Sequence, residues 1–263
     1  MLQSVARYTN DAVGIEKALK FVQSFSQVAE VMFASTPEEL ARWAMAKEQA
    51  NIGRRYFRIV KWIDCWTTAY NLLTTYNSPS ASTGDEKPQK NNNNSNQDAI
   101  RVTLMIAKFS LLGIFLFMEM FCIADAMHIT HNSWAPGLQF ESLKFWFYSL
   151  AVSIVLGLYD LFMLDSSAAH AEPPAVSEKT KAKVTVRTGG KEASTVIEHT
   201  PAPQNQNAHK RQAILKNIVA DSCDLLIPGS IVGWIPIDPV PVGIAGTLSA
   251  ILGGSDAWAR VNP

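Results

Sequence analysis

The chain has 263 residues, of which 48% are apolar and 17% charged, and its 23 lysine and arginine residues balance 23 aspartate and glutamate residues. This balance excludes the basic composition of a general nucleic-acid binder, so we expect no nucleic-acid partner. The charged fraction lies below the roughly 25% of an average soluble domain. Because the apolar residues concentrate outside two polar segments, 77–99 and 166–208, the composition favours a membrane protein.

Cysteine spacing and catalytic motifs give negative results. Cys65, Cys122 and Cys223 are widely spaced and odd in number, which predicts neither a disulfide framework nor a metal site. The first residues hold no apolar stretch, so no cleaved secretory signal is expected. The sequence has no phosphate-binding loop and no dinucleotide-binding, zinc-protease or serine-hydrolase motif. We expect no enzymatic activity, no catalytic residue, no cofactor and no metal.

The first predicted element is a helix over residues 11–34, capped by Asn10 or Asp11. Apolar residues recur along it at spacings of three and four, which places them on one face. This predicted inner face consists of Ile15, Leu19, Val22, Phe25 or Ser26, Ala29 and Met32.

The next helix has the clearest start signal in the sequence. In STPEE, Thr36 suits the N-cap, Pro37 the first helical position and Glu39 the reciprocal partner of a capping box. No further proline follows before the first polar segment, and only Gly53 weakens the pattern. We therefore predict one helix from 37 to about 76.

The middle of the chain alternates polar and apolar segments. Residues 77–99 and 166–208 are low in apolar content and are predicted to be disordered linkers. Between them, 100–127 and 139–165 are apolar helices, joined by a turn at THNSWAPG. Lys108, Glu119 and Asp125 lie inside the first of these helices.

The C-terminal part is predicted to hold an amphipathic helix over 210–226 and a second helix over 242–259. Four prolines, at 228, 236, 239 and 241, predict an irregular crossing between them. Small residues recur along the last helix at intervals of four, which favours close helix–helix contact in lipid. The predicted helix-packing residues are Ala245, Gly246, Ser249, Ala250, Gly253 and Gly254, in line with Ala257.

The predicted fold is all-α, a membrane-associated bundle of amphipathic and apolar helices joined by the two linkers. Its parts are an N-terminal amphipathic region (1–76), linker 77–99, an apolar hairpin (100–165), linker 166–208 and a C-terminal helical region (209–263). No segment reaches the roughly 18 uncharged residues of a clean transmembrane helix. Membrane embedding is still favoured, because aromatic residues flank the aliphatic centre of 146–164 in the manner of an interfacial belt.

The segment 50–73 carries the functional hypothesis. It combines an apolar stripe with four cations within eight residues, the composition of a helix that lies in an anionic membrane surface. We expect the four cations on or beside the polar face. The predicted membrane- and lipid-binding residues are Ile52, Arg54, Arg55, Tyr56, Phe57, Arg58, Ile59, Lys61, Trp62, Ile63 and Trp66, and the stripe continues through Tyr70 and Leu73.

The sequence RRYFRIVKWIDCW resembles the R-x-x-F-R-x-x-K signature of the peroxin-eleven family of peroxisomal membrane proliferation factors. The pattern falls on Arg54, Phe57, Arg58 and Lys61, and ARWAMAKEQA precedes it as in that family. VPVGIAGTLSAILGGSDAW resembles the closing segment of the family. The resemblance covers roughly 10–75 and 210–260, and the two polar insertions depart from shorter family members.

The resemblance implies a peroxisomal membrane protein that promotes membrane curvature, elongation and division by inserting a basic amphipathic helix into one leaflet. The expected partners are an anionic phospholipid membrane and a second copy of the chain in a homo-oligomer, and the resemblance adds fission machinery including a dynamin-like GTPase. Two alternatives stay open. One is a small-solute pore or transporter of the same membrane, lined by Lys108, Glu119, Asp125 and Asp160; the other is a soluble helical scaffold.

Overall fold

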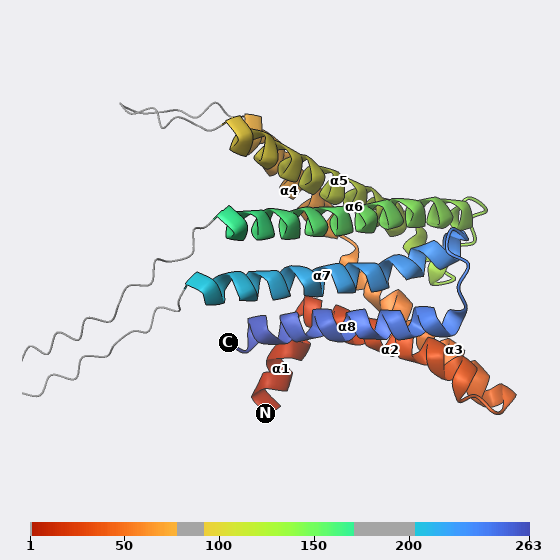
Figure 1. Ribbon diagram of the computed structural model, residues 1–263. Helices are drawn as coiled ribbons and strands as arrows, with labels where there is room; N and C mark the ends of the chain where they lie inside the picture. The colour runs from red at the N-terminus through yellow and green to blue at the C-terminus, as the bar shows by residue number, and fades with distance from the viewer. Residues whose placement is uncertain (1, 78–91, 171–202) are drawn as a thin grey trace, which may run out of the picture.

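The computed structural model describes residues 2–77, 92–170 and 203–263 (Figure 1). This described part of the chain is helical throughout apart from its connections, which confirms the all-α prediction. The helices are α1 (Leu2–Asn10), α2 (Ala12–Met32), α3 (Pro37–Arg58), α4 (Lys61–Asn77), α5 (Asn92–Ala126), α6 (Ala135–His170), α7 (Pro203–Val232) and α8 (Pro239–Val261).

The predicted N-terminal signals are confirmed. Asp11 caps α2 by accepting a hydrogen bond from the backbone N–H of Gly14 at 2.8 Å. Thr36 and Glu39 form the reciprocal capping box that opens α3, with Pro37 in its first turn. The short helix α1 precedes α2 and was not predicted.

The prediction of one helix from 37 to about 76 is wrong. The chain leaves the α-helix at Ile59 and Val60 and re-enters it at Lys61. No proline or glycine stands there, so local propensity gave no sign of the break. The break lets α3 pack against α2 and α4 pack against α5, and tertiary contacts of this kind override propensity.

The apolar hairpin is longer than predicted. The helices α5 and α6 begin and end inside the segments expected as linkers, at Asn92 and His170, and α7 begins inside the second one at Pro203. A formed helix can extend through polar residues, because propagation costs far less than nucleation. The prediction of disorder for 78–91 and 171–202 lies outside the described residues.

Two helices, over Gln97–Ala126 and Ala135–Ser166, are long and apolar enough to cross a membrane. They are antiparallel neighbours joined by a short connection, as expected for the hairpin (Figure 1). At about 1.5 Å per residue each exceeds the roughly 30 Å of a hydrocarbon core.

The irregular crossing begins later than predicted, because α7 continues through the buried Pro228. A proline removes one backbone hydrogen bond and can be absorbed by a bend, and α7 bends toward its C-terminal end (Figure 1). The helix stops at Gly233, whose φ of +82° requires the left-handed conformation that glycine adopts readily.

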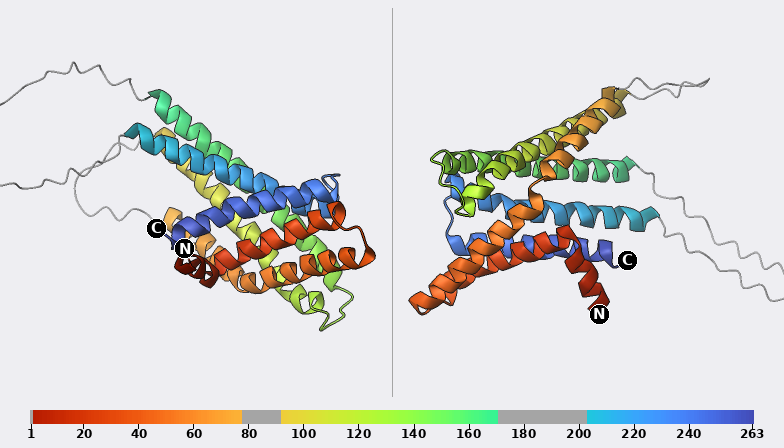
Figure 2. Two further views of the ribbon diagram at one scale, coloured as in Figure 1. Left: turned by 90° about the horizontal axis from the view of Figure 1, so that it is seen from below. Right: turned by 180° about the vertical axis from the view of Figure 1, so that it is seen from behind.

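The helices pack in the spatial order α3, α2, α8, α7, α6, α5, α4, and the α3–α4 junction closes this row. Figure 2 shows α6, α7 and α8 in one layer, with the α2–α3 and α4–α5 pairs on the other side. The two described ends of the chain meet, because Tyr8 contacts Trp258 and Arg260 pairs with Asp11 at 2.5 Å.

Polarity in the α2 region is inverted relative to a water-soluble bundle. Glu16, Lys20 and Ser24 are buried, whereas Val22 and Met32 of the predicted inner face are exposed. The predicted face was therefore wrong in these positions, although Ala29 is fully buried. Both buried charges have ion-pair partners inside the bundle, and apolar side chains outside a charged interior fit an outer surface that meets lipid.

Candidate functional site

The signature residues Arg54, Phe57, Arg58 and Lys61 lie where α3 ends and α4 begins. At this junction the chain passes from the α2 side of the molecule to α5 (Figure 2). The signature thus lies at the connection between the α2–α3 pair and the α4–α5 pair.

The Arg54 side chain points toward α2 and is 5% exposed. Its guanidinium donates to Gln23 Oε1 at 2.6 Å and lies 3.4 Å from Glu16 Oε1. Burial lowers the pKa of Arg54 to about 10, so the side chain stays charged at neutral pH. Burial alone would raise the pKa of Glu16, but the charges of Lys17 and Arg54 outweigh it and lower that pKa well below 4.5.

Arg55 and Arg58 converge on one carboxylate of α5. The Arg58 guanidinium lies 2.9 Å and Arg55 Nε 3.7 Å from Glu119 Oε1. Arg55 also donates to Gln139 Oε1 of α6 at 3.0 Å, and the Arg58 guanidinium lies over the Phe115 ring. We call Arg54, Arg55 and Arg58 the arginine cluster; it ties α3 to α2, α5 and α6.

The orientation of the cations differs from the sequence expectation. The arginine cluster points into the protein, and only Lys61 of the four cations is exposed. The buried carboxylates of Glu16 and Glu119 account for this, because an unpaired carboxylate at either position would be costly. Lipid binding by the three arginines remains a prediction, whereas their pairing with protein groups is a feature of the structure.

The two tryptophans of the predicted stripe face α5. The rings of Trp62 and Trp66 pack at 5.2 and 5.4 Å from the Phe117 ring. A Cβ atom at Gly113 would lie 2.3 Å from Trp66 Nε1, so glycine provides the room for this ring. These two aromatic side chains therefore hold α4 against α5.

The remaining stripe residues divide between partial burial and exposure. Ile52 and Ile59 are half-buried, whereas Tyr56, Phe57, Val60 and Ile63 are exposed. Along α4 the exposed apolar side chains continue through Tyr70 and Leu73. We call the set Tyr56, Phe57, Val60, Ile63, Tyr70 and Leu73 the junction apolar face.

A polar strip runs beside the junction apolar face on α4. Asp64, Asn71 and Thr75 are exposed at spacings of seven and four, which places them on one line of the helix. The opposite side of α4 buries Cys65 and Ala69 against the bundle. The exposed half of α4 is thus divided lengthwise into an apolar and a polar surface.

The small residues of α8 lie against other helices of the bundle. Ala245, Gly246, Ser249 and Ala250 are buried, and a Cβ at Gly246 would lie 2.4 Å from Ser24 Oγ of α2. Gly253 and Gly254 are half-buried and lie against Lys17 and Tyr8. The helices that meet this face are α2 and α7 of the same chain.

A family model for Peroxisomal biogenesis factor 11 (PEX11) matches residues 2–258. The chain belongs to this family. Its members are peroxisomal membrane-associated proteins of peroxisome biogenesis and proliferation, and the two long apolar helices agree with a membrane location. No curated protein and no solved structure matches the chain.

This PEX11 family member also has a buried charge cluster that sequence reasoning missed. Lys20 Nζ donates to both carboxylate oxygens of Asp224, at 2.5 and 2.6 Å. The Ser249 hydroxyl accepts from Lys20 Nζ and donates to Asp224 Oδ1. Burial lowers the pKa of Lys20 to about 8, against the opposing charge of Asp224. The cluster joins α2, α7 and α8.

The partners of the arginine cluster were also not predicted. Glu119 was visible as a charge inside an apolar helix, which is a signal for a buried partner. Glu16 and Gln23 gave a weaker signal, since both fall between the apolar positions of α2 and read as solvent-facing. Gln139 gave none.

The four charges proposed to line a solute path do not share one environment in this PEX11 family member. Lys108 and Asp160 line the same cavity between α5, α6 and α7. Glu119 is held by the arginine cluster, and Asp125 accepts a hydrogen bond from the backbone N–H of Asn132 at 2.7 Å. These four charges therefore do not form the continuous row that the pore alternative would need.

Proposed function

We propose that the protein promotes curvature, elongation and division of the peroxisomal membrane by inserting the junction apolar face into one leaflet. The main support is that the side chains of the junction apolar face are exposed next to a helical hairpin long enough to cross a membrane. An exposed apolar strip beside a polar strip is the pattern of a helix in a membrane interface.

The energetics support insertion. Val60 is 62% and Ile63 47% exposed, so about half of each side chain is available for transfer into hydrocarbon. Complete burial of such a side chain is worth about 1.5–3 kcal/mol, and half of that is about 1 kcal/mol each. The set of six therefore supplies several kcal/mol, and the exposed Lys61 adds on the order of 1 kcal/mol near anionic lipid.

The arginine cluster supports a rigid wedge rather than a free amphipathic helix. Arg55 and Arg58 connect the junction to Glu119, inside the first candidate span. A helix fixed to a span resists sliding out of the leaflet, because displacing it would separate these ion pairs. Insertion of such a wedge expands one leaflet relative to the other, which bends the membrane.

The chain divides by role in this proposal. Residues 1–76 carry the wedge, whereas 100–165 and 209–263 anchor it, and the segments 77–99 and 166–208 connect these parts. A homo-oligomer would concentrate wedges locally, and a dynamin-like GTPase would complete division. The protein acts without catalysis.

Vesicle tubulation by the reconstituted full-length protein tests this proposal. Ile63→Glu places a carboxylate in the junction apolar face and is expected to abolish tubules, whereas Asn71→Glu on the polar strip should leave them unchanged. Both variants should stay in the membrane after a carbonate wash. Normal tubulation by Ile63→Glu would contradict the wedge, and release by carbonate would support the soluble scaffold.

A further inference from the structure

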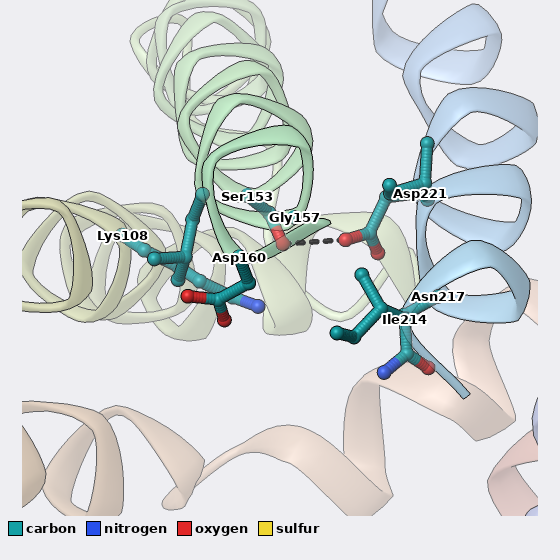
Figure 3. A pocket seen from close by; sticks show the side chains of 9 residues that line it. Lys108, Ser153, Gly157, Asp160, Ile214, Asn217 and Asp221 are labelled. Carbon is teal, nitrogen blue, oxygen red and sulfur yellow. Dashed lines mark hydrogen bonds between the residues drawn. The ribbon is translucent and has the colours of Figure 1, made fainter. Parts of the chain in front are cut away.

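A polar cavity lies between α5, α6 and α7, away from the α3–α4 junction. Its volume is about 290 Å³, equivalent to about ten water molecules at roughly 30 Å³ each. The side chains of Lys108, Ser153, Asp160 and Asp221 converge on it from all three helices (Figure 3). It can hold a small polar group but not a folded peptide.

Lys108 and Asp221 are opposite charges that attract each other across this cavity without forming a direct ion pair. Asp160 is paired with Arg101 at 2.7 Å, so its charge is balanced. Asp221 accepts a hydrogen bond from Ser153. Among the residues that the structure describes, Lys108 makes no side-chain hydrogen bond and no ion pair within 4.0 Å, and its ammonium lies 6.0 Å from the centre of the Phe109 ring. An occupant that complements this site carries both a negative and a positive group.

The surroundings are those of a lipid-facing protein. The cavity walls include both candidate spans, and Lys108 lies near the middle of the first. The helices that line the cavity also carry exposed apolar side chains, Val155 and Leu158 on α6 and Val219 on α7. A charge at such depth is costly unless a partner neutralises it, which makes a lipid headgroup a suitable occupant.

We propose that this cavity binds a zwitterion with a primary ammonium next to a phosphate, the chemistry of phosphoethanolamine. The phosphate pairs with Lys108 and accepts from the Asn217 amide, and the ammonium donates to Asp221 and Asp160. A primary ammonium offers three N–H donors, whereas the quaternary ammonium of choline offers none. Phosphatidylethanolamine is the lipid source of this chemistry, and free phosphoethanolamine is the soluble one.

Lipid retention by the full-length protein tests the site. The protein is reconstituted with equal amounts of phosphatidylethanolamine and phosphatidylcholine, extracted in mild detergent, and its bound lipid is measured by mass spectrometry. The wild type should retain phosphatidylethanolamine in preference by about tenfold or more, the value of one buried charge-assisted contact. Lys108→Met and Asp221→Asn should remove the preference, and Lys144→Met, whose lysine pairs with Glu141 outside the cavity, should keep it.

The lipid preference of the wild type can refute the proposal by itself, so the test does not depend on whether the variants fold. Equal retention of both lipids by the wild type would refute recognition of a primary ammonium. A preference that survives both cavity substitutions would place the binding elsewhere. A second arm adds free phosphoethanolamine to lipid-depleted protein: a raised unfolding midpoint that Lys108→Met abolishes identifies a soluble ligand, and no change alongside lipid retention identifies the lipid.

Discussion

Glu119→Gln tests the arginine cluster most sharply, because it removes one charge that two buried guanidinium groups share. The substitution keeps the shape of the side chain but leaves Arg55 and Arg58 without a carboxylate. At an effective dielectric constant of about 20, the attractions at 2.9 and 3.7 Å are about 6 and about 4 kcal/mol. Desolvation offsets much of this, and breaking a buried pair on one side costs about 3–5 kcal/mol.

The measurement is the free energy of unfolding in mild detergent titrated with a denaturing detergent, followed by tryptophan fluorescence. Glu119→Gln should lower it by the 3–5 kcal/mol just derived. Glu38→Gln is the matched control, since its partner Arg42 lies 3.8 Å away on an exposed surface and such pairs contribute little. The control should behave as the wild type.

A triple variant separates the charge from the packing. Replacing Arg55, Arg58 and Glu119 together by methionine removes the shared carboxylate with both of its partner charges and keeps much of their volume. Buried ion clusters can be replaced by apolar residues at little or no cost, so stability should largely return. Unchanged stability of Glu119→Gln, or a triple variant less stable than the single one, would refute the account of the cluster.

Three further predictions follow from the packing. Gly246→Leu should destabilise the protein by about 1–3 kcal/mol, because its Cβ would meet Ser24 at 2.4 Å, while Gly137→Leu, with open space around it, should not. Equal unfolding midpoints of the two variants would contradict the α2–α8 contact. Since the pKa of Glu16 is lowered in the folded protein, the Glu16 carboxylate stabilises the fold above pH 4.5, and this stabilisation is lost as the pH falls below that value. In an acid titration of the free energy of unfolding, this pH-dependent part should be absent from Glu16→Gln. Deleting residues 80–90 should leave membrane attachment intact in a carbonate wash, because α4 and α5 pack directly on each other.

Local signals in the sequence predicted the helices well. The capping box at Thr36 depends only on neighbours in the chain, and the structure confirms it. The small residues of α8 recur on one helix surface, and four of the six predicted positions are buried. The break at Ile59 was not predictable in this way, because it depends on two separate partners, α2 and α5. The same applies to the extent of α5 beyond the polar residues at its start.

The site was predicted by residue type and misjudged in orientation. The sequence identified the signature and the apolar stripe, and placed the cations on or beside the polar face. In a lipid-facing bundle the inner surface can be polar, so periodicity locates the faces of a helix without stating which one is inside. Glu119, embedded in an apolar helix, was the residue that could have indicated a charged interior.

The depth of the α3–α4 junction in a membrane tests the central claim most directly. A nitroxide is placed at Val60 or at Ile63 of the reconstituted protein, on a cysteine-free background, with Glu38 as the exposed reference site. Collisions with oxygen, which partitions into hydrocarbon, are compared with collisions with a water-soluble nickel complex. The account predicts that Val60 and Ile63 are reached by oxygen and shielded from nickel, while Glu38 shows the reverse; nickel access at Val60 and Ile63 equal to that at Glu38 would contradict insertion.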